Sequence, residues 1–442
     1  MINNKKIGLA LSGGGYRAAA YHIGTLRKLK EYHILSEVDV ISSISGGSII
    51  GAYYCLNKAE WDIKSEGEFE QLLLSKNVIG YILTSLSFLI TYVIILAYLG
   101  AIVYCLFTQR PWIVLIFLPL LVILLFKFQF QIFPTSNKAE KAYGKYFFDK
   151  LTLQNLPDNP KLVIGTTNLQ TARPFTFSKD WMQDSTYQYL KKDGVIEPVT
   201  FNGDNFPVAK AVIASCCVPI VFTPITIEKK YFQNPGRDFE RVYPRLVDGG
   251  LYDNQGIHKI MQKGDYNCDI VITSDAGIKL PYTATYNNFA TLLLRIMDVF
   301  MARIKNAQIV QDVYDNSHTV KKEIAYISLS WSIENCIPGF VRNLKDKQIS
   351  QELIDAHGLL PAWVKDPKTY EDEIIRHLKK TTAYDNIIKP NTDELRLAQN
   401  VSTGLSPLTR PELDALIKQA ECLTEIQLKL YCPSLISKQN EA

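Results

Sequence analysis

The sequence lacks the patterns that bind a metal ion or build a disulfide framework. Its eight cysteines include no CxxC pair, and no HExxH or similar ligand spacing occurs, so neither a metal nor another cofactor is expected. No secretion signal is visible after MINNKK, which favours reduced thiols in the cytoplasm. The formal charge is only +4 and no basic stripe is interleaved with aromatics, so nucleic acid is not an expected partner.

A strand, a tight turn and a helix are predicted in VISSISGGSIIGAY, residues 40–53, with Ser45 at the centre of the turn. A sharp turn presses the residues on either side of its apex together, so small residues at Ser43 and Gly47 are a steric requirement for an exposed Ser45 hydroxyl. The turn also puts Ser45 at the positive end of a helix, which favours an alkoxide. Ser43 replaces the first glycine of G-x-S-x-G, and a serine- and glycine-rich turn that binds nothing is the alternative.

A glycine loop, residues 12–15, follows an apolar strand at Ile7–Leu11 and precedes a helix over residues 16–32. Successive glycines at a helix N-terminus let backbone N–H groups point at an anion. One candidate is a pyrophosphate, since Gly13, Gly15 and Ala18 also fit the dinucleotide pattern, although the second strand carries no acidic residue at its end. The other is the oxyanion of an acyl intermediate, with Arg17 supporting the loop or a lipid phosphate. A merely structural glycine turn is a third possibility.

Residues 77–109 contain no charge, and after Arg110 and Pro111 the chain is again apolar through Phe126. A membrane-spanning helix needs about 20 such residues, so a transmembrane helical hairpin is the simplest interpretation. Lysines flank both ends and only Arg110 lies in the turn, so the positive-inside rule puts both flanks in the cytoplasm. A buried core hairpin of a soluble protein is the alternative. The flanking lysines are Lys58, Lys64, Lys76, Lys127, Lys138, Lys141 and Lys145.

A second chemical motif is RLVDGGLYDNQG, residues 245–256, in which a strand delivers Asp248 into a glycine turn. A carboxylate there could accept the proton of a serine hydroxyl as a general base. An Asx turn closing the loop would explain Asp248 and Gly249 without chemistry, and it is the preferred explanation for Asp253 and Asn254.

Other segments have clear local patterns. Cys216 and Cys217 point apart as neighbours, without a nearby histidine, and are interpreted as buried small residues. Helices are expected over residues 138–153, 208–215, 289–315 (a long packing helix) and 410–422 (capped by Thr409), and strands over 161–167, 174–178 and 322–330.

Three ordered motifs, SGGGYR (12–17), SISGG (43–47) and DGG (248–250), together resemble the patatin-like phospholipases. The resemblance extends over about residues 7–277 once the hairpin is removed, with further echoes in TTNLQT, AVIASCCVPIVFTP and SDAG. It implies an α/β fold, three-layer α/β/α with a central mostly parallel sheet, and a Ser/Asp dyad without histidine. Carried over, Ser45 is the nucleophile, Asp248 the base, and the N–H groups of Gly13, Gly14 and Gly15 the oxyanion hole, with Arg17, Gly47, Gly249 and Gly250 in support.

The histidines fit this interpretation. A conventional triad needs a histidine after the acid, yet His258, His318, His357 and His377 lie at no glycine-framed strand end, and His22 belongs to the first helix with a surface or packing role. The expected domains are residues 1–76 and 134–335 (catalytic), 77–133 (transmembrane hairpin) and 336–442 (helical extension).

The expected function is that of a membrane-anchored lipid acyl hydrolase whose partners are a phospholipid or related acyl ester and the bilayer. A catalytically silent lipid-binding or scaffolding protein on the same fold is the rival, and a nucleotide-dependent membrane enzyme is third.

Overall fold

The chain folds around one large sheet. In a computed structural model of the protein, residues 5–108, 111–280, 282, 286–309, 311 and 322–436 are described. The strand order is β11–β10–β1–β2–β3–β4–β5, with β9 paired to β3 and to β8. The strands from β11 to β3 are mutually parallel, which confirms the predicted α/β fold with a mostly parallel sheet. The strands are β1 (Ile7–Leu11), β2 (Val40–Ile44), β3 (Lys161–Asn168), β4 (Arg173–Phe177), β5 (Met182–Asp184), β8 (Ile225–Thr226), β9 (Arg245–Asp248), β10 (Ile270–Asp275) and β11 (Glu323–Ser328).

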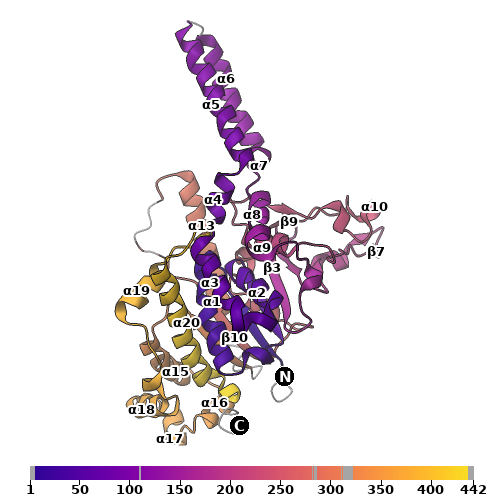
Figure 1. Cartoon of the computed structure of the whole chain (residues 1–442). Helices are drawn as coiled ribbons and strands as arrows, with labels where there is room; N and C mark the ends of the chain where they lie inside the picture. Colours follow the sequence, from indigo (N-terminus) through magenta and orange to yellow (C-terminus); the bar gives the residue numbers. More distant parts are fainter. Residues whose placement is uncertain are drawn as a thin grey trace.

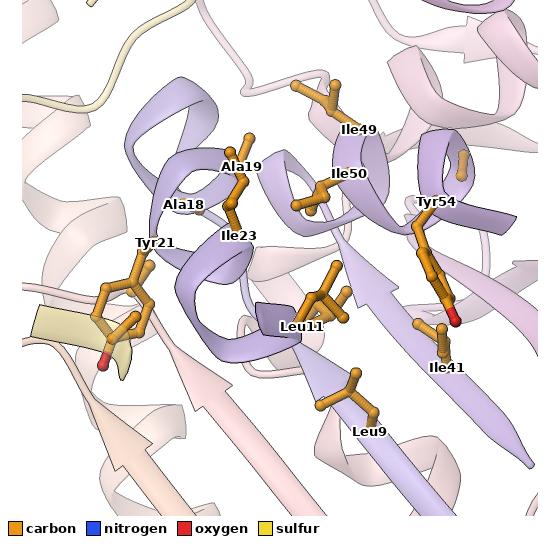
Figure 2. Packing of buried hydrophobic residues seen from close by; sticks show 14 of the residues in the cluster. Leu9, Leu11, Ala18, Ala19, Tyr21, Ile23, Ile41, Ile49, Ile50 and Tyr54 are labelled. Atoms are coloured by element: carbon orange, nitrogen blue, oxygen red, sulfur yellow. The ribbon is translucent and has the colours of Figure 1, made fainter. Parts of the chain in front are cut away.

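The central strands are buried on both faces, as their near-continuous apolar runs require. Leu9, Leu11 and Ile41 pack under the helices α1 (Gly15–Glu31) and α2 (Gly46–Leu56), as Figure 2 shows. Ala10 and Val40 face the opposite side of the sheet, where α12 (Ile257–Met261) covers them. The register pairs Leu11 of β1 with Ser43 of β2, so the loops that follow these two strands meet at one edge of the sheet.

The longest C-terminal helix, α20 (Arg410–Tyr431), belongs to the main core. It begins where predicted, with the Thr409 side chain accepting from the Glu412 N–H, but it extends nine residues beyond the predicted end at Cys422. It lies so close to α1 that a methyl group added at Gly24 would be 2.2 Å from the Ile417 carbonyl oxygen. The buried side chains of α20 therefore belong to the same core as those of the central sheet.

The apolar segment forms two antiparallel helices that project from the domain, α5 (Leu86–Phe107) and α6 (Pro111–Lys127) (Figure 1). The Tyr98 hydroxyl donates a hydrogen bond to the Phe117 carbonyl across the pair, at 2.8 Å. Within the described residues, α5 is long and apolar enough to cross a membrane, with 22 residues, a mean hydropathy of 2.4 and 11% burial. Residues 112–127 and 129–148 pass the same test only as one span bent by 76°. A hairpin that crosses twice therefore stays a prediction.

The long packing helix predicted over 289–315 is α13 (Phe289–Gln308), and it is more exposed than a core helix, since none of its described side chains is fully buried. Its predicted continuation, with His318, lies outside the described residues. The helix predicted over 138–153 is also shorter, ending at Tyr143. The remaining principal elements are α3 (Glu66–Ser75), α4 (Val78–Leu83), α8 (Thr135–Tyr143), α9 (Val208–Cys216), α10 (Pro235–Asp238), α11 (Gly250–Asp253), α15 (Cys336–Lys345), α16 (Gln351–Ala356), α18 (Glu371–Thr381) and α19 (Thr392–Asn400).

Candidate active site

Ser45 occupies a strained turn between β2 and α2. Its backbone has φ 49° and ψ −120°, a conformation that L-residues rarely adopt and that surrounding structure must hold in place. The turn is pressed against its neighbours, because a methyl group added at Gly47 would lie 2.3 Å from the Leu11 carbonyl oxygen. One added at Gly46 would lie 2.2 Å from the Gly15 carbonyl oxygen. The predicted steric need for a small residue at Gly47 therefore has a direct structural cause.

Ser215 of α9 holds the Ser45 turn from behind. Its hydroxyl accepts the Ser45 N–H at 2.8 Å and donates to the Gly165 carbonyl at 2.6 Å. It also lies 3.1 Å from the Ser48 hydroxyl, which completes its hydrogen-bonding capacity. Sequence reasoning missed Ser215, and its only signal was a hydroxyl in an otherwise apolar helix predicted to pack near the site.

Asp248 ends β9, opposite Thr166 of β3. Its carboxylate accepts the Gly250 N–H at 2.7 Å, and the Ser45 hydroxyl lies near enough to act on its pKa. Burial raises the pKa of Asp248 to about 6, although the Gly250 N–H and the Ser45 hydroxyl act to lower it. A methyl group at Gly249 would lie 2.4 Å from the Gly165 carbonyl oxygen, so only glycine lets β9 approach this closely. The structure thus brings Ser45 and Asp248 together from positions distant in the chain.

The glycine loop lies against the Ser45 turn, and its three glycines are not equivalent. Gly13 donates its N–H to the Asn254 carbonyl at 2.9 Å, so the predicted use of this N–H for an oxyanion is contradicted in the conformation described. Gly14 and Gly15 have φ values of 142° and 60°, and their N–H groups have no hydrogen-bond partner in the described part of the chain. Two free donors therefore remain beside Ser45, at the N-terminus of α1.

The same loop leaves little room for a dinucleotide. The Tyr16 N–H, in the first turn of α1, donates to the Gly404 carbonyl at 2.8 Å. A methyl group at Gly15 would lie 2.3 Å from that carbonyl oxygen, so chain from the C-terminal region already covers the helix N-terminus. A pyrophosphate would need the Tyr16 N–H and the space that Gly404 occupies. The nucleotide interpretation therefore loses its structural basis.

Arg17 supports the loop from inside the protein. Its guanidinium is 4% exposed and donates to the carbonyls of Ala276 at 3.1 Å and Val401 at 3.2 Å. Burial lowers the pKa of Arg17 to about 10, against the opposing effect of Asp275. Of the two roles predicted for Arg17, support of the loop agrees with this placement and contact with a lipid phosphate does not.

The described histidines form no hydrogen bond or ring contact with Ser45 or Asp248. His22 is buried between the Ser274 hydroxyl and the Ser12 carbonyl, 2.8 and 3.0 Å from its ring nitrogens, and burial lowers its pKa to about 4. His258 contacts the Tyr252 hydroxyl at 3.2 Å. His22 therefore has the packing role that was predicted for it, and the arrangement at Ser45 contains a hydroxyl, a carboxylate and backbone N–H groups.

Cys216 and Cys217 are buried, as expected. Burial raises the pKa of the Cys216 thiol well above its usual value, against the opposing effect of the Tyr143 and Ser45 hydroxyls. The Cys217 sulfur lies 3.2 Å from the Ser136 hydroxyl. Among the described residues no group of three or more histidine, cysteine and acidic side chains could hold a metal ion.

Comparison with known proteins places this geometry in a family. Human GIVD cytosolic phospholipase A2 is similar in structure, with a TM-score of 0.45 and 11% identity over 99% of this chain, which spans 61% of the human chain. VipD from Legionella pneumophila gives a TM-score of 0.31 and 13% identity, over 99% of this chain and 88% of that one. No curated protein matches the chain in sequence. The patatin-like phospholipase family model matches residues 9–260, more than half of the chain, and the protein therefore belongs to the patatin-like phospholipase family.

Proposed function

We propose that the protein is a membrane-anchored lipid acyl hydrolase in which Ser45 is the nucleophile and Asp248 its general base. The observation that carries the proposal is the placement of the hydroxyl of a strained residue, at a helix N-terminus, beside a buried carboxylate whose pKa it acts to lower. Membership of a phospholipase family supports a lipid ester as the substrate. A panel of lipid substrates would identify the head group and the acyl position that are cleaved.

In the proposed reaction, the Ser45 oxygen attacks the acyl carbonyl carbon while its proton passes to Asp248. The tetrahedral intermediate collapses to an acyl-enzyme, and Asp248 returns the proton to the departing alcohol. Water then attacks the acyl-enzyme, giving its proton to Asp248, and the fatty acid leaves as the Ser45 hydroxyl is restored. A pKa of about 6 suits this role, because the carboxylate is ionised at neutral pH yet basic enough to hold a proton in passing.

The oxyanion is proposed to bind the N–H groups of Gly14 and Gly15. Neither N–H has a partner among the described residues, and both lie at the positive end of α1, where negative charge is stabilised. Gly13 does not bind the oxyanion in this proposal, because its N–H anchors the loop to the Asn254 carbonyl. Gly47 allows the Ser45 turn to approach Leu11, and Gly249 allows the Asp248 turn to approach Gly165 and Ile44.

The hairpin is proposed to anchor the enzyme with both flanks in the cytoplasm and the catalytic domain facing that side. Most large apolar side chains of α5 and α6 are exposed, for example Leu86 at 74% and Phe107 at 83%. A monomeric soluble protein rarely leaves so continuous an apolar surface in water. Insertion of residues 77–133 as a hairpin returns the chain to its starting side and leaves the sheet intact.

The test is labelling by a fluorophosphonate probe together with hydrolysis of a lipid panel. Wild type should react with the probe and release fatty acid, and Ser45→Ala should do neither while staying folded. Ser48→Ala is the matched control, because it removes a hydroxyl from the same turn and should keep the label. A wild-type protein that never reacts would favour the silent lipid-binding alternative, and labelled Ser45→Ala would move the nucleophile elsewhere.

A further inference from the structure

The helix α13 has two faces with different surroundings. One face rests on α11, the turn that follows Asp248: a methyl group at Gly250 would lie 2.8 Å from Cε of Met301. On the same face, the Lys305 ammonium pairs with the buried Asp275 carboxylate at 2.5 Å. This inner face therefore connects α13 to the part of the fold that holds the proposed base.

The opposite face is apolar and open. At about 100° per residue, positions three, four and seven apart share a helix face. Phe289 and Phe300 are 75% and 63% exposed, and the intervening residues of this face are exposed as well. This apolar face of α13 consists of Phe289, Leu292, Ile296, Val299 and Phe300. It is not a packing surface of the described fold, so the predicted packing helix packs through its inner face only.

The charges beside this face favour one kind of partner. Because Lys305 is paired with Asp275 on the inner face, the remaining charges of the helix are Arg295 and Arg303 against Asp298, a net charge of +1. An apolar face flanked by basic side chains is typical of helices that lie in the interface of an anionic membrane. A second copy of the chain would bring like charges together, which disfavours self-association through this face.

The location of α13 in the fold also favours a membrane as its partner. Figure 1 shows α13 at the end of the domain from which α5 and α6 project. A hairpin in the bilayer would hold this end of the domain at the membrane surface. The apolar face of α13 would then add to an apolar surface already provided by the hairpin.

We propose that α13 is an interfacial helix that inserts its apolar face into an anionic lipid surface and seats the site beside the substrate. The effect of docking on catalysis rests on the proposed function. The docking of α13 to the membrane can be measured without turnover. Because Met301 and Lys305 join α13 to Gly250 and Asp275, insertion of the outer face fixes the distance between the bilayer and Asp248.

The docking test places a fluorophore on α13 of the full-length protein in phosphatidylglycerol vesicles. A cysteine at Phe300 (Phe300→Cys) and one at Asp298 (Asp298→Cys) are labelled in a Cys105→Ser background, since the other cysteines are buried. Brominated lipid should quench the label at position 300 several-fold more than the label at position 298. Equal quenching, or no loss of quenching when the vesicles are changed to phosphatidylcholine, would overturn the proposal.

The functional test compares vesicle phosphatidylglycerol with a soluble short-chain ester. Phe300→Asp should lower turnover of the vesicle lipid by about tenfold or more, because one large apolar side chain no longer enters the membrane. It should leave turnover of the soluble ester unchanged, and Phe300→Leu should affect neither substrate. Equal losses on both substrates, or no loss on vesicles, would refute the inference. A wild type that hydrolyses neither substrate would refute the proposed function alone, and the quenching test would still decide docking.

Discussion

Removing the charge of Asp248, by lowering the pH or by substitution, should stop turnover at a pH that is set by the burial of this side chain. With a pKa of about 6, about one tenth of the Asp248 carboxyl groups are ionised at pH 5 and about nine tenths at pH 7. The value of kcat/KM for a soluble ester should therefore fall about tenfold per pH unit below pH 6 and level off above it. An ordinary exposed aspartate would keep full activity at pH 5.

The assay is a pH series of initial rates with wild type and Asp248→Asn, using a substrate without ionisable groups. Asp248→Asn should lose turnover at every pH and show no limb near pH 6. His22 and His258, each with its pKa lowered to about 4 by burial, could not produce such a limb. A flat wild-type profile down to pH 5, or an Asp248→Asn variant that keeps the limb, would refute the assignment of the base.

The same pKa shift has a consequence for stability. Raising the pKa from 3.8 to about 6 means that the folded state binds this proton more tightly than the unfolded state. Burying the Asp248 charge lowers the free energy of unfolding. This loss is absent below pH 4, grows between pH 4 and 6, and amounts to about 3 kcal/mol above that range. At pH 8, Asp248→Asn should therefore raise the free energy of unfolding by up to about 3 kcal/mol.

Asp275 supplies the matched control, since it is a second buried aspartate at a strand end. Burial acts to raise its pKa, but Lys305 and the hydrogen bonds from Gly277 and Tyr326 outweigh that effect and lower it. Asp275→Asn should therefore destabilise the protein at pH 8, the opposite sign from Asp248→Asn. Urea unfolding in detergent would measure both, and two changes of the same sign would contradict the charge argument.

Three further predictions concern the frame around the site. Ser215→Ala leaves the buried Ser45 N–H without its acceptor and should cost about 1–3 kcal/mol of unfolding free energy, with reduced kcat. Gly249→Ala drives a methyl group into a backbone oxygen and should abolish turnover, whereas Gly236→Ala, with open space around it, should be near neutral in the same ester assay. Deleting residues 79–130 with a short linker should release a folded protein from membranes; unchanged sedimentation with membranes would count against the hairpin anchor.

Local patterns predicted much of the fold because they depend on neighbours in the chain. Apolar runs marked the strands around Leu9 and Ile41, and the capping residue Thr409 marked the start of α20. The meeting of Ser45 with Asp248 was expected only through a family resemblance, because no local pattern pairs residues so far apart. Register in the sheet decides that meeting, and a single sequence does not display register.

The errors arose where a residue's partner comes from a distant element. Gly13 was expected to offer a free N–H, but Asn254 accepts it. Nothing around Arg17 in the sequence indicates that its hydrogen-bond acceptors would be Ala276 and Val401. The apolar residues of α13 have the period of a packing helix, but periodicity alone does not show that Phe289 and Phe300 stay exposed.

The contacts of residues 401–404 bear on when the enzyme becomes competent during its synthesis. The Gly404 carbonyl accepts the Tyr16 N–H, and the Val401 carbonyl accepts from Arg17, so the loop near the start of the chain is completed by a segment made near the end. A ribosome-bound chain would already carry α5 and α6 while the glycine loop still lacked these contacts. Under the proposed function, the nascent protein would therefore reach the bilayer before it could hydrolyse the lipids there.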